Sequence, residues 1–342
     1  MKSNEPIDIV ILWVDSQDSK WKSSLKKNSP QQNNISNDES RFRCWNTLHF
    51  IFRSFDEFLP WVNKVHFVTY GHLPTWLNVN HPKLNVVRHE DIIPEEHRPT
   101  FNSNAIEVNL NKIESLSEQF ILFNDDTFIL SPLSSERFFI DGKPVDFLNQ
   151  CIKRKGWLYS TLRPQNLLNT IAINNNIRIV NQLVNIFDID EKLYLSKQYS
   201  LKLRVKNRLC KAIYREYSWF KLNHVPQPHL KSTIDFLWRS RYSELYDTSS
   251  HKFRSKSDTT QYLFRYFNLA TGKFFPHNPN DTLSININSS RDVNCLIDNI
   301  KGVNLLSITD ADSLTGVEFE RAKLIWGDYL LKILPAKSSF EL

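Results

Sequence analysis

The chain has 342 residues, of which 41% are hydrophobic and 23% charged, proportions typical of a globular protein with one large domain or two ordinary ones. Its seven glycines form neither a Walker loop nor a dinucleotide-binding loop, so any phosphate would be held by side chains, a metal or a helix N-terminus. The net charge of +6 favours a small anionic ligand or an anionic membrane surface over nucleic acid, because no single basic face is evident.

The cysteines and the absence of apolar export signals indicate the compartment. Cys44, Cys151, Cys210 and Cys295 are widely separated and lack the spacing of a zinc site, which suits a reducing environment. The first residues contain no signal-peptide apolar region, and the sequence has no apolar run of about 18 residues. We therefore expect a cytoplasmic protein.

Strands and helices alternate in the first part of the chain. Residues 7–14 are an apolar run that ends at Asp15, which predicts a buried parallel strand with a carboxylate at its C-terminal end. The polar residues 16–40 predict a mobile loop. Further strands are predicted at residues 64–69, 84–87 and 119–123, and helices at 45–58 and 103–116. This alternation predicts an α/β sheet of mixed or mainly parallel strands, with its ligand at their C-terminal ends.

The pattern becomes mostly helical from about residue 165. Helices are predicted at residues 166–187, 203–217, 230–245, 259–269 and 319–334, whereas residues 285–310 are expected to return to the sheet. The richest basic stretch is residues 202–215, with Lys202, Arg204, Lys206, Arg208, Lys211 and Arg215. A solvated helix face explains this stretch, and so does contact with membrane lipid or with a polyanionic acceptor.

Two adjacent carboxylates, Asp125 and Asp126, come directly after the predicted strand of residues 119–123. Carboxylates at a buried strand end are costly unless a cation neutralises them. A divalent ion that bridges diphosphate oxygens would do so, whereas an ordinary Asx turn explains the same residues without any ligand. The residues alone leave these two interpretations evenly balanced.

Three further clusters each allow a chemical and a structural interpretation. Glu107 follows Asn104 by about one helical turn, a pattern that favours a helix cap. His224 lies in a proline-rich turn and can accept a proton from a sugar hydroxyl, although most lone histidines are structural. Arg254 belongs to a basic cluster that suits either a phosphate group or a solvated surface.

These clusters follow the order of four blocks in which the chain resembles the Stealth family of hexose-1-phosphate transferases. That family includes bacterial capsule polymerases and the catalytic subunit of the lysosomal-enzyme N-acetylglucosamine-1-phosphotransferase. The matching blocks are residues 7–15, residues 41–126, residues 224–226 with 251–254, and a short block at 295–299. One departure is Cys44, which occupies a position where the family often has an acidic residue.

The resemblance implies a GT-A-like, Rossmann-type sheet that binds a nucleotide sugar, followed by a largely helical C-terminal part. Residues 1–135 would bind the nucleotide sugar and a metal, residues 136–220 would be a variable, mostly helical insertion, and residues 221–342 would complete the site. The implied reaction moves a sugar-1-phosphate from a UDP-linked donor to an oligo- or polysaccharide hydroxyl with Mg²⁺ or Mn²⁺. Capsule biogenesis also implies peripheral association with the inner membrane face or with the capsule assembly machinery.

The resemblance also implies roles for individual residues. Asp126, Glu107 and Asp125 become the expected metal ligands, His224 the base, and Arg254 the diphosphate clamp. Asp126, His224 and Arg254 together form the expected catalytic group. The expected substrate-binding residues are Trp13, Asp15, Arg41, Arg43, Asn102, Asn104 and Asn124. The alternatives are a conventional GT-A glycosyltransferase that transfers only the sugar, and a carbohydrate-binding or scaffold protein of a surface-polymer assembly.

Overall fold

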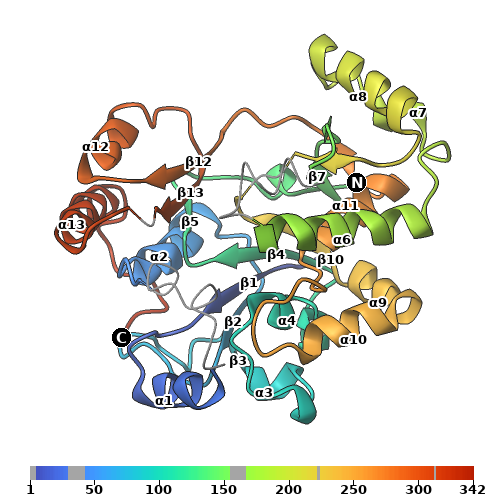
Figure 1. Cartoon of the computed structure of the whole chain (residues 1–342). Helices are drawn as coiled ribbons and strands as arrows, with labels where there is room; N and C mark the ends of the chain where they lie inside the picture. Colours follow the sequence, from blue (N-terminus) through green and yellow to red (C-terminus); the bar gives the residue numbers. More distant parts are fainter. Residues whose placement is uncertain (1–4, 30–42, 155–166, 222–223, 312) are drawn as a thin grey trace.

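The computed structural model describes residues 5–29, 43–154, 167–221, 224–311 and 313–342, and a five-stranded sheet lies at its centre (Figure 1). The strand order is β10-β4-β1-β2-β3. The bounds are β1 Ile7–Trp13, β2 Val65–Thr69, β3 Leu84–Arg88, β4 Gln119–Asn124 and β10 Gln227–Leu230. Strands β1 to β4 run parallel, and β10 joins β4 in the antiparallel direction. This sheet and the helices that follow it confirm the predicted α/β fold with a mainly parallel, Rossmann-type sheet and a largely helical C-terminal part.

Side chains of the central strands alternate between two hydrophobic clusters, one on each face of the sheet. In β1, Ile9 and Ile11 belong to one cluster and Val10 to the other, and all three are fully buried. Because both faces of the sheet are covered, a side chain of this strand is either apolar or forms hydrogen bonds with a buried partner. This burial on both sides explains why residues 7–14 read as a continuous apolar run rather than an alternating one.

The cluster that contains Ile9 lies beneath α2 (Leu48–Phe58), α13 (Gly316–Ile333) and a second sheet. That sheet has the order β12-β13-β5, with β12 Thr282–Ile287, β13 Leu305–Asp310 and β5 Thr127–Ile129. The expectation that residues 285–310 rejoin the central sheet is therefore wrong. Between the two strands lies α12 (Ser290–Asp298), because Val293 and Leu296 recur at helical spacing and are buried together.

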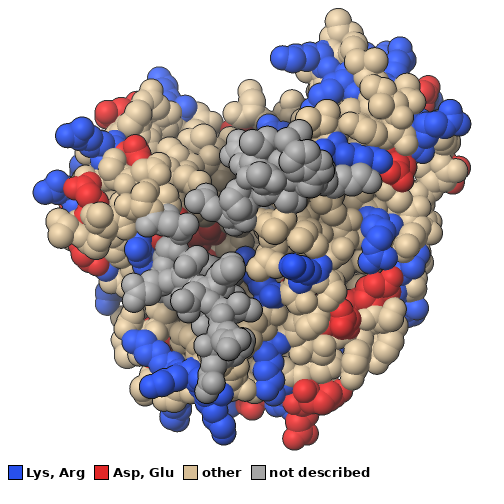
Figure 2. Space-filling view, in the orientation of Figure 1, with Lys and Arg blue, Asp and Glu red and all other residues tan. Residues whose placement is uncertain are grey.

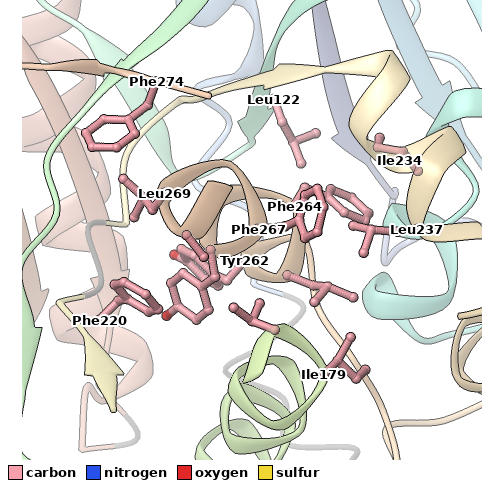
Figure 3. Packing of buried hydrophobic residues seen from close by; sticks show 14 of the residues in the cluster. Leu122, Ile179, Phe220, Ile234, Leu237, Tyr262, Phe264, Phe267, Leu269 and Phe274 are labelled. Atoms are coloured by element: carbon pink, nitrogen blue, oxygen red, sulfur yellow. The ribbon is translucent and has the colours of Figure 1, made fainter. Parts of the chain in front are cut away.

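The opposite face carries the helices from the middle and later parts of the chain. They are α4 Ser103–Glu107, α6 Leu167–Leu183, α9 Lys231–Ser240, α10 Tyr242–Ser250 and α11 Tyr262–Thr271. Figure 3 shows α11 at the centre of this layer, with Phe264 and Phe267 near Ile234 and Leu237 of α9. All of the residues of α11 from Tyr262 to Ala270 are buried. Helix α11 is therefore the core element of this layer.

Several predicted elements differ from the observed ones. Within the predicted loop 16–40, residues Ser19–Asn28 form α1, which begins where the Asp18 side chain accepts a hydrogen bond from the Trp21 N–H. The predicted helix 103–116 stops at Glu107, and the predicted helix 230–245 divides at Arg241, whose φ of −137° interrupts the helix.

The remaining elements are short, except for α8, which has 14 residues. They are α3 His89–Ile92, α7 Glu191–Tyr194, α8 Leu201–Tyr214, β6 Phe139–Ile140, β7 Lys143–Asp146, β8 Gln150–Cys151, β9 Trp219–Phe220 and β11 Phe275–Pro276, with 3-10 turns at Glu95–His97, Leu110–Lys112 and Ser135–Arg137. Because β10 pairs with β4 and β13 pairs with β5, the first and third predicted parts share two sheets. The boundaries at 135 and 220 stay predictions.

Within the described ranges, none of the helices combines the length and the apolar character needed to cross a bilayer.

A buried pair of polar side chains joins β1 to β2. Asp8 and His66 are both fully buried, and Asp8 Oδ2 lies 3.0 Å from His66 Nε2. The Asp8 carboxylate also accepts hydrogen bonds from the Ser117 N–H at 2.7 Å and from Asn63 Nδ2 at 2.8 Å. Burial opposes ionisation of Asp8, but these hydrogen bonds outweigh it and lower the pKa of the carboxyl below its usual value.

Replacing Asp8 by asparagine should lower the free energy of unfolding at pH 7 by about 2 kcal/mol, because charged hydrogen bonds are lost. The pKa of Asp8 is lower in the folded than in the unfolded protein, so its stabilisation is complete above the unfolded value of 3.8 and is lost as the pH falls through the folded value. Urea denaturation at stepwise lower pH should show the difference between Asp8→Asn and the parent shrinking below about pH 4. The exposed Asp298→Asn is the control, and a difference that stays constant with pH would contradict the assignment.

Candidate active site

A cleft of about 300 Å³ opens where β1, β4 and β13 end. Trp13 and Val14 line it from the end of β1, Asp125 and Asp126 from the turn after β4, and residues 308–310 from β13. Residues 43–48, which lead into α2, form the remaining wall. Because β1 and β4 are parallel neighbours, their C-terminal ends meet at one edge of the sheet, where open α/β folds bind ligands.

Three carboxylates line this cleft. Solvent reaches the Asp125 side chain, but the surrounding protein limits its hydration and Asp126 and Asp310 add negative charge, which together raise the pKa of Asp125 to about 7. Asp310 accepts weak hydrogen bonds from Arg43 Nη1 and Trp45 Nε1, each at 3.4 Å. Burial nevertheless raises the pKa of Asp310. A cleft with this much negative charge favours a bound cation.

His224 contacts one of these carboxylates directly. Its Nε2 lies 2.9 Å from Asp126 Oδ2, and its side chain is 37% exposed. Burial opposes protonation of His224, but the hydrogen bond and charge of Asp126, together with the charge of Glu107, raise the pKa of the imidazole. The Asp126 carboxylate therefore favours the protonated imidazole, and a cation that neutralised Asp126 would lower the pKa of His224.

Glu107 and Arg254 complete the charged group around His224. Glu107 is 6% exposed, and burial raises its pKa to about 7 although the charges of Arg254 and His224 oppose this. Its Oε2 accepts a hydrogen bond from the Gln261 N–H at 2.9 Å. Arg254 Nη2 donates to Ser103 Oγ at 3.2 Å, whereas its buried Nε has no partner among the described residues. The structure thus places His224 in contact with Asp126 and within reach of the charges of Glu107 and Arg254.

Asp258 holds two of these segments together, and the sequence gave no reason to single it out. It is fully buried and accepts hydrogen bonds from Asn102 Nδ2 at 2.9 Å, Asn104 Nδ2 at 3.0 Å, the Ser255 N–H at 3.0 Å and His251 Nδ1 at 2.7 Å. The amide nitrogens of Asn102 and Asn104 therefore bind Asp258 and hold α4 against the segment that carries Arg254. Direct contact of either asparagine with substrate stays a prediction.

Replacing Asp258 by alanine should lower the free energy of unfolding by about 3 kcal/mol, because four donors, two of them buried, lose their acceptor. Activity should also fall, since Arg254 and α4 lose their shared support. Urea denaturation and an activity assay measure the two effects. Asp247→Ala is the matched control, because Asp247 lies on the exposed side of the same His251 and its loss should cost less than about 1 kcal/mol. Equal effects of the two substitutions would contradict the role of Asp258.

The other predicted substrate residues that the structure describes lie around the same edge of the sheet. The Trp13 ring stacks on Phe67 with ring centroids 5.5 Å apart, and one side of it lines the cleft. The Asp15 N–H donates to His72 Nε2 at 2.6 Å. Asn124 is the last residue of β4. Arg43 reaches Asp310, and Arg41 lies outside the described residues.

Asp310 is a cleft residue that sequence reasoning missed. The predicted fourth block, residues 295–299, lies instead at the end of α12, and the carboxylate that reaches the cleft comes from the end of β13. A signal existed, because residues 305–308 are a buried, largely apolar strand followed closely by Asp310. The same pattern led to Asp15 and Asp125 in the sequence.

A second cleft, of about 520 Å³, lies beside the ends of β2 and β3. Tyr70, His72, Arg88 and Arg98 contribute aromatic and cationic groups to its wall. It adjoins the first cleft, because the His72 ring packs edge-on against Trp13 at 5.2 Å. An aromatic ring beside two guanidinium groups suits a nucleoside attached to phosphate.

The carboxylates of the cleft would supply only some of the ligands that a divalent cation needs. In the portion of the chain that the structure describes, no three His, Cys, Asp or Glu side chains converge as a ready metal site. However, Asp126 Oδ1 is buried and lacks a hydrogen-bond partner there, with Asp125 beside it. Mg²⁺ is commonly held by one or two carboxylates, with water and substrate phosphates as its other ligands. Asp125 and Asp126 fit that requirement, and a metal-ligand role for Glu107, whose Oε2 accepts a backbone hydrogen bond, stays a prediction.

Comparison with known proteins shows similarity over the whole chain. A sequence profile of Stealth protein CR2, conserved region 2, matches residues 41–146. The capsular polysaccharide phosphotransferase WcwK of Streptococcus pneumoniae is 35% identical, and the alignment covers 100% of this chain and 99% of that protein. The receptor polysaccharide phosphotransferase WefC of Streptococcus gordonii is 31% identical, with 99% of each chain covered.

A third relative and one solved structure extend the comparison. The exopolysaccharide phosphotransferase cps2G of Lactiplantibacillus plantarum is 30% identical, over 98% of this chain and 96% of that protein. The apo structure of the bifunctional glycosyltransferase WbbM matches with a TM-score of 0.36 and 8% identity, over 97% of this chain and 52% of that one, which is too weak to assign a fold. The profile match and the full-length identities show that the chain belongs to the Stealth family.

Proposed function

We propose that this protein is a polysaccharide phosphotransferase of capsule or exopolysaccharide synthesis. It moves a sugar-1-phosphate from a nucleotide-diphosphate sugar to a carbohydrate hydroxyl, forms a phosphodiester and releases a nucleoside monophosphate. Full-length similarity to relatives named as polysaccharide phosphotransferases carries this proposal. The contact between His224 and Asp126, with Arg254 nearby, supports it, because phosphoryl transfer needs a base and a cation close together.

In the proposed reaction the acceptor oxygen attacks the sugar-linked β-phosphorus. The new oxygen–phosphorus bond forms as the bond from the β-phosphorus to the bridging oxygen breaks, and the nucleoside monophosphate keeps that electron pair. His224 takes the proton of the acceptor hydroxyl, and Arg254 binds the phosphoryl oxygens with its free N–H groups. A bound Mg²⁺ or Mn²⁺ would neutralise diphosphate charge, with Asp125 and Asp126 as its proposed protein ligands.

The two adjoining clefts suggest how the donor is placed. We propose that its diphosphate lies against the carboxylate cleft and its nucleoside, with UDP as the expected nucleotide, in the cleft lined by Tyr70 and Arg88. Trp13 lies between the two clefts and would separate the diphosphate from the nucleoside. The acceptor is an oligo- or polysaccharide, and we place the protein in the cytoplasm, peripherally at the inner membrane face or beside the capsule assembly machinery.

The released nucleotide tests this function. The protein is incubated with a panel of nucleotide sugars, Mg²⁺ or Mn²⁺ and an oligosaccharide primer, and the products are followed by chromatography and phosphorus NMR. We expect a nucleoside monophosphate, a phosphodiester resonance, and loss of turnover in EDTA that either cation restores. Release of a nucleoside diphosphate with an unphosphorylated product would instead identify a conventional glycosyltransferase.

A further inference from the structure

Helix α8 carries a row of aliphatic side chains on its solvent side. Leu201, Val205, Leu209 and Ile213 are 67%, 51%, 56% and 70% exposed. Because these residues are spaced by four, they lie along one side of the helix. The helix has 14 residues and is therefore about 21 Å long. We refer to these four residues as the aliphatic row.

The opposite side of α8 fixes the direction in which the aliphatic row points. Leu203, Asn207 and Cys210 are the buried residues of the helix. Asn207 Oδ1 accepts a hydrogen bond from the Gln150 N–H at 3.0 Å, and its Nδ2 donates to the Leu148 carbonyl at 2.8 Å. Turning the aliphatic row inward would break these buried bonds, which is costly. The outward orientation is therefore built into the packing of α8 on β8.

The charge along α8 itself is of one sign. Residues 195–215 contain seven basic side chains and no acidic one: Lys197, Lys202, Arg204, Lys206, Arg208, Lys211 and Arg215. Lys202, Arg208 and Arg215 are exposed beside the row. Lys211 and Arg215 also pack against Phe187, which is half exposed, at 5.4 Å each. Figure 2 shows Lys and Arg side chains over the lobe at the upper right, where Figure 1 places α8.

We infer that α8 binds the surface of an anionic lipid bilayer. The aliphatic row would enter the boundary between head groups and acyl chains, while the flanking cations contact lipid phosphates, as in other interfacial helices. A soluble polyanion would use the cations but leave the aliphatic row in water. A protein partner would cover the row without needing uniform charge along the helix. The inference gives the membrane association proposed above a named surface, and it does not require the proposed reaction.

Vesicle sedimentation with the full-length protein tests this surface. The probes are vesicles of phosphatidylcholine alone and of phosphatidylcholine with 30% phosphatidylglycerol. We expect binding to the anionic vesicles that weakens at high salt. The double variant Leu209→Gln/Ile213→Gln should bind at least about tenfold more weakly, and Lys202→Gln/Arg208→Gln roughly fivefold more weakly per charge removed. Leu324→Gln/Leu331→Gln, at residues 66% and 50% exposed on α13, is the matched control and should bind like the parent.

Specific results would overturn the inference. These are no binding to anionic vesicles, equal binding to neutral ones, or α8 variants that bind like the parent while their thermal midpoints show a folded protein. Binding that needs the cations but not Leu209 and Ile213, and that soluble polyphosphate competes away, would identify a polyanion site instead. A dimer in size-exclusion chromatography that the Leu209→Gln/Ile213→Gln variant dissociates would identify a protein interface. Because the cleft is separate from α8, the turnover assay reports independently on the proposed reaction.

Discussion

Replacing His224 by alanine should lower the rate of sugar-1-phosphate transfer by roughly 10²- to 10⁴-fold, the range typical for loss of a general base. The side chain is 37% exposed and its Nε2 contacts Asp126 at 2.9 Å, so the substitution removes the proton acceptor without opening a large cavity. Turnover is measured as nucleoside monophosphate released under saturating donor. His277→Ala is the control, because His277 is an exposed histidine outside the cleft lining.

A titration separates a proton-accepting His224 from a merely structural one. The hydrogen bond and charge of Asp126 raise the pKa of His224, so Asp126→Asn should lower that pKa. NMR titration of the imidazole in the absence of divalent cations measures this without interference from a metal. A His224→Ala protein that turns over at the parental rate would remove the base from the mechanism, whatever the titration shows.

The parts of the fold that sequence alone could predict are those whose signal is local. Burial on both faces makes β1 and β4 continuous apolar runs, and the carboxylates that follow them mark the C-terminal edge of the sheet. The sequence alone therefore places Asp125 and Asp126 at one edge of the sheet. His224 and Arg254 could be linked to that edge only through the family resemblance, because they lie about 100 or more residues further along the chain.

The features that sequence reasoning missed depend on distant partners. In the sequence, Asp258 cannot be told apart from any other loop aspartate. Its role depends on Asn102, 156 residues earlier, which donates a hydrogen bond to it. Residues 285–310 have strand propensity, but the sheet they join depends on which strand edge is available to pair with them. In the structure β13 pairs with β5 rather than with the central strands. Helix α1 was hidden because its sequence is mainly polar, with Trp21 as its buried residue. In each case tertiary pairing outweighs local pattern.

Replacing Arg254 by lysine should lower kcat/KM for the donor by roughly 10²- to 10³-fold, although the charge is kept. A guanidinium offers a planar fork of N–H groups to two phosphoryl oxygens, and an ammonium cannot reproduce it. In the structure Arg254 uses Nη2 on Ser103 and leaves a buried Nε without a described partner, so donors remain for a ligand. Arg239→Lys, at an exposed position on α9, is the matched control and should leave turnover unchanged.

The alanine variant distinguishes a phosphate clamp from a partner of Glu107. The charge of Arg254 lowers the pKa of the buried Glu107, so Arg254→Ala should raise that pKa further above 7 and shift the pH dependence of turnover, whereas Arg254→Lys keeps the charge and should not. A clamp predicts that both variants lose donor affinity and rate at every pH. If Arg254→Lys retains the full activity of the parent, then a positive charge near Glu107 is sufficient for activity. The phosphoryl oxygens must in that case be bound by another cation of the cleft, for which Arg43 is in position.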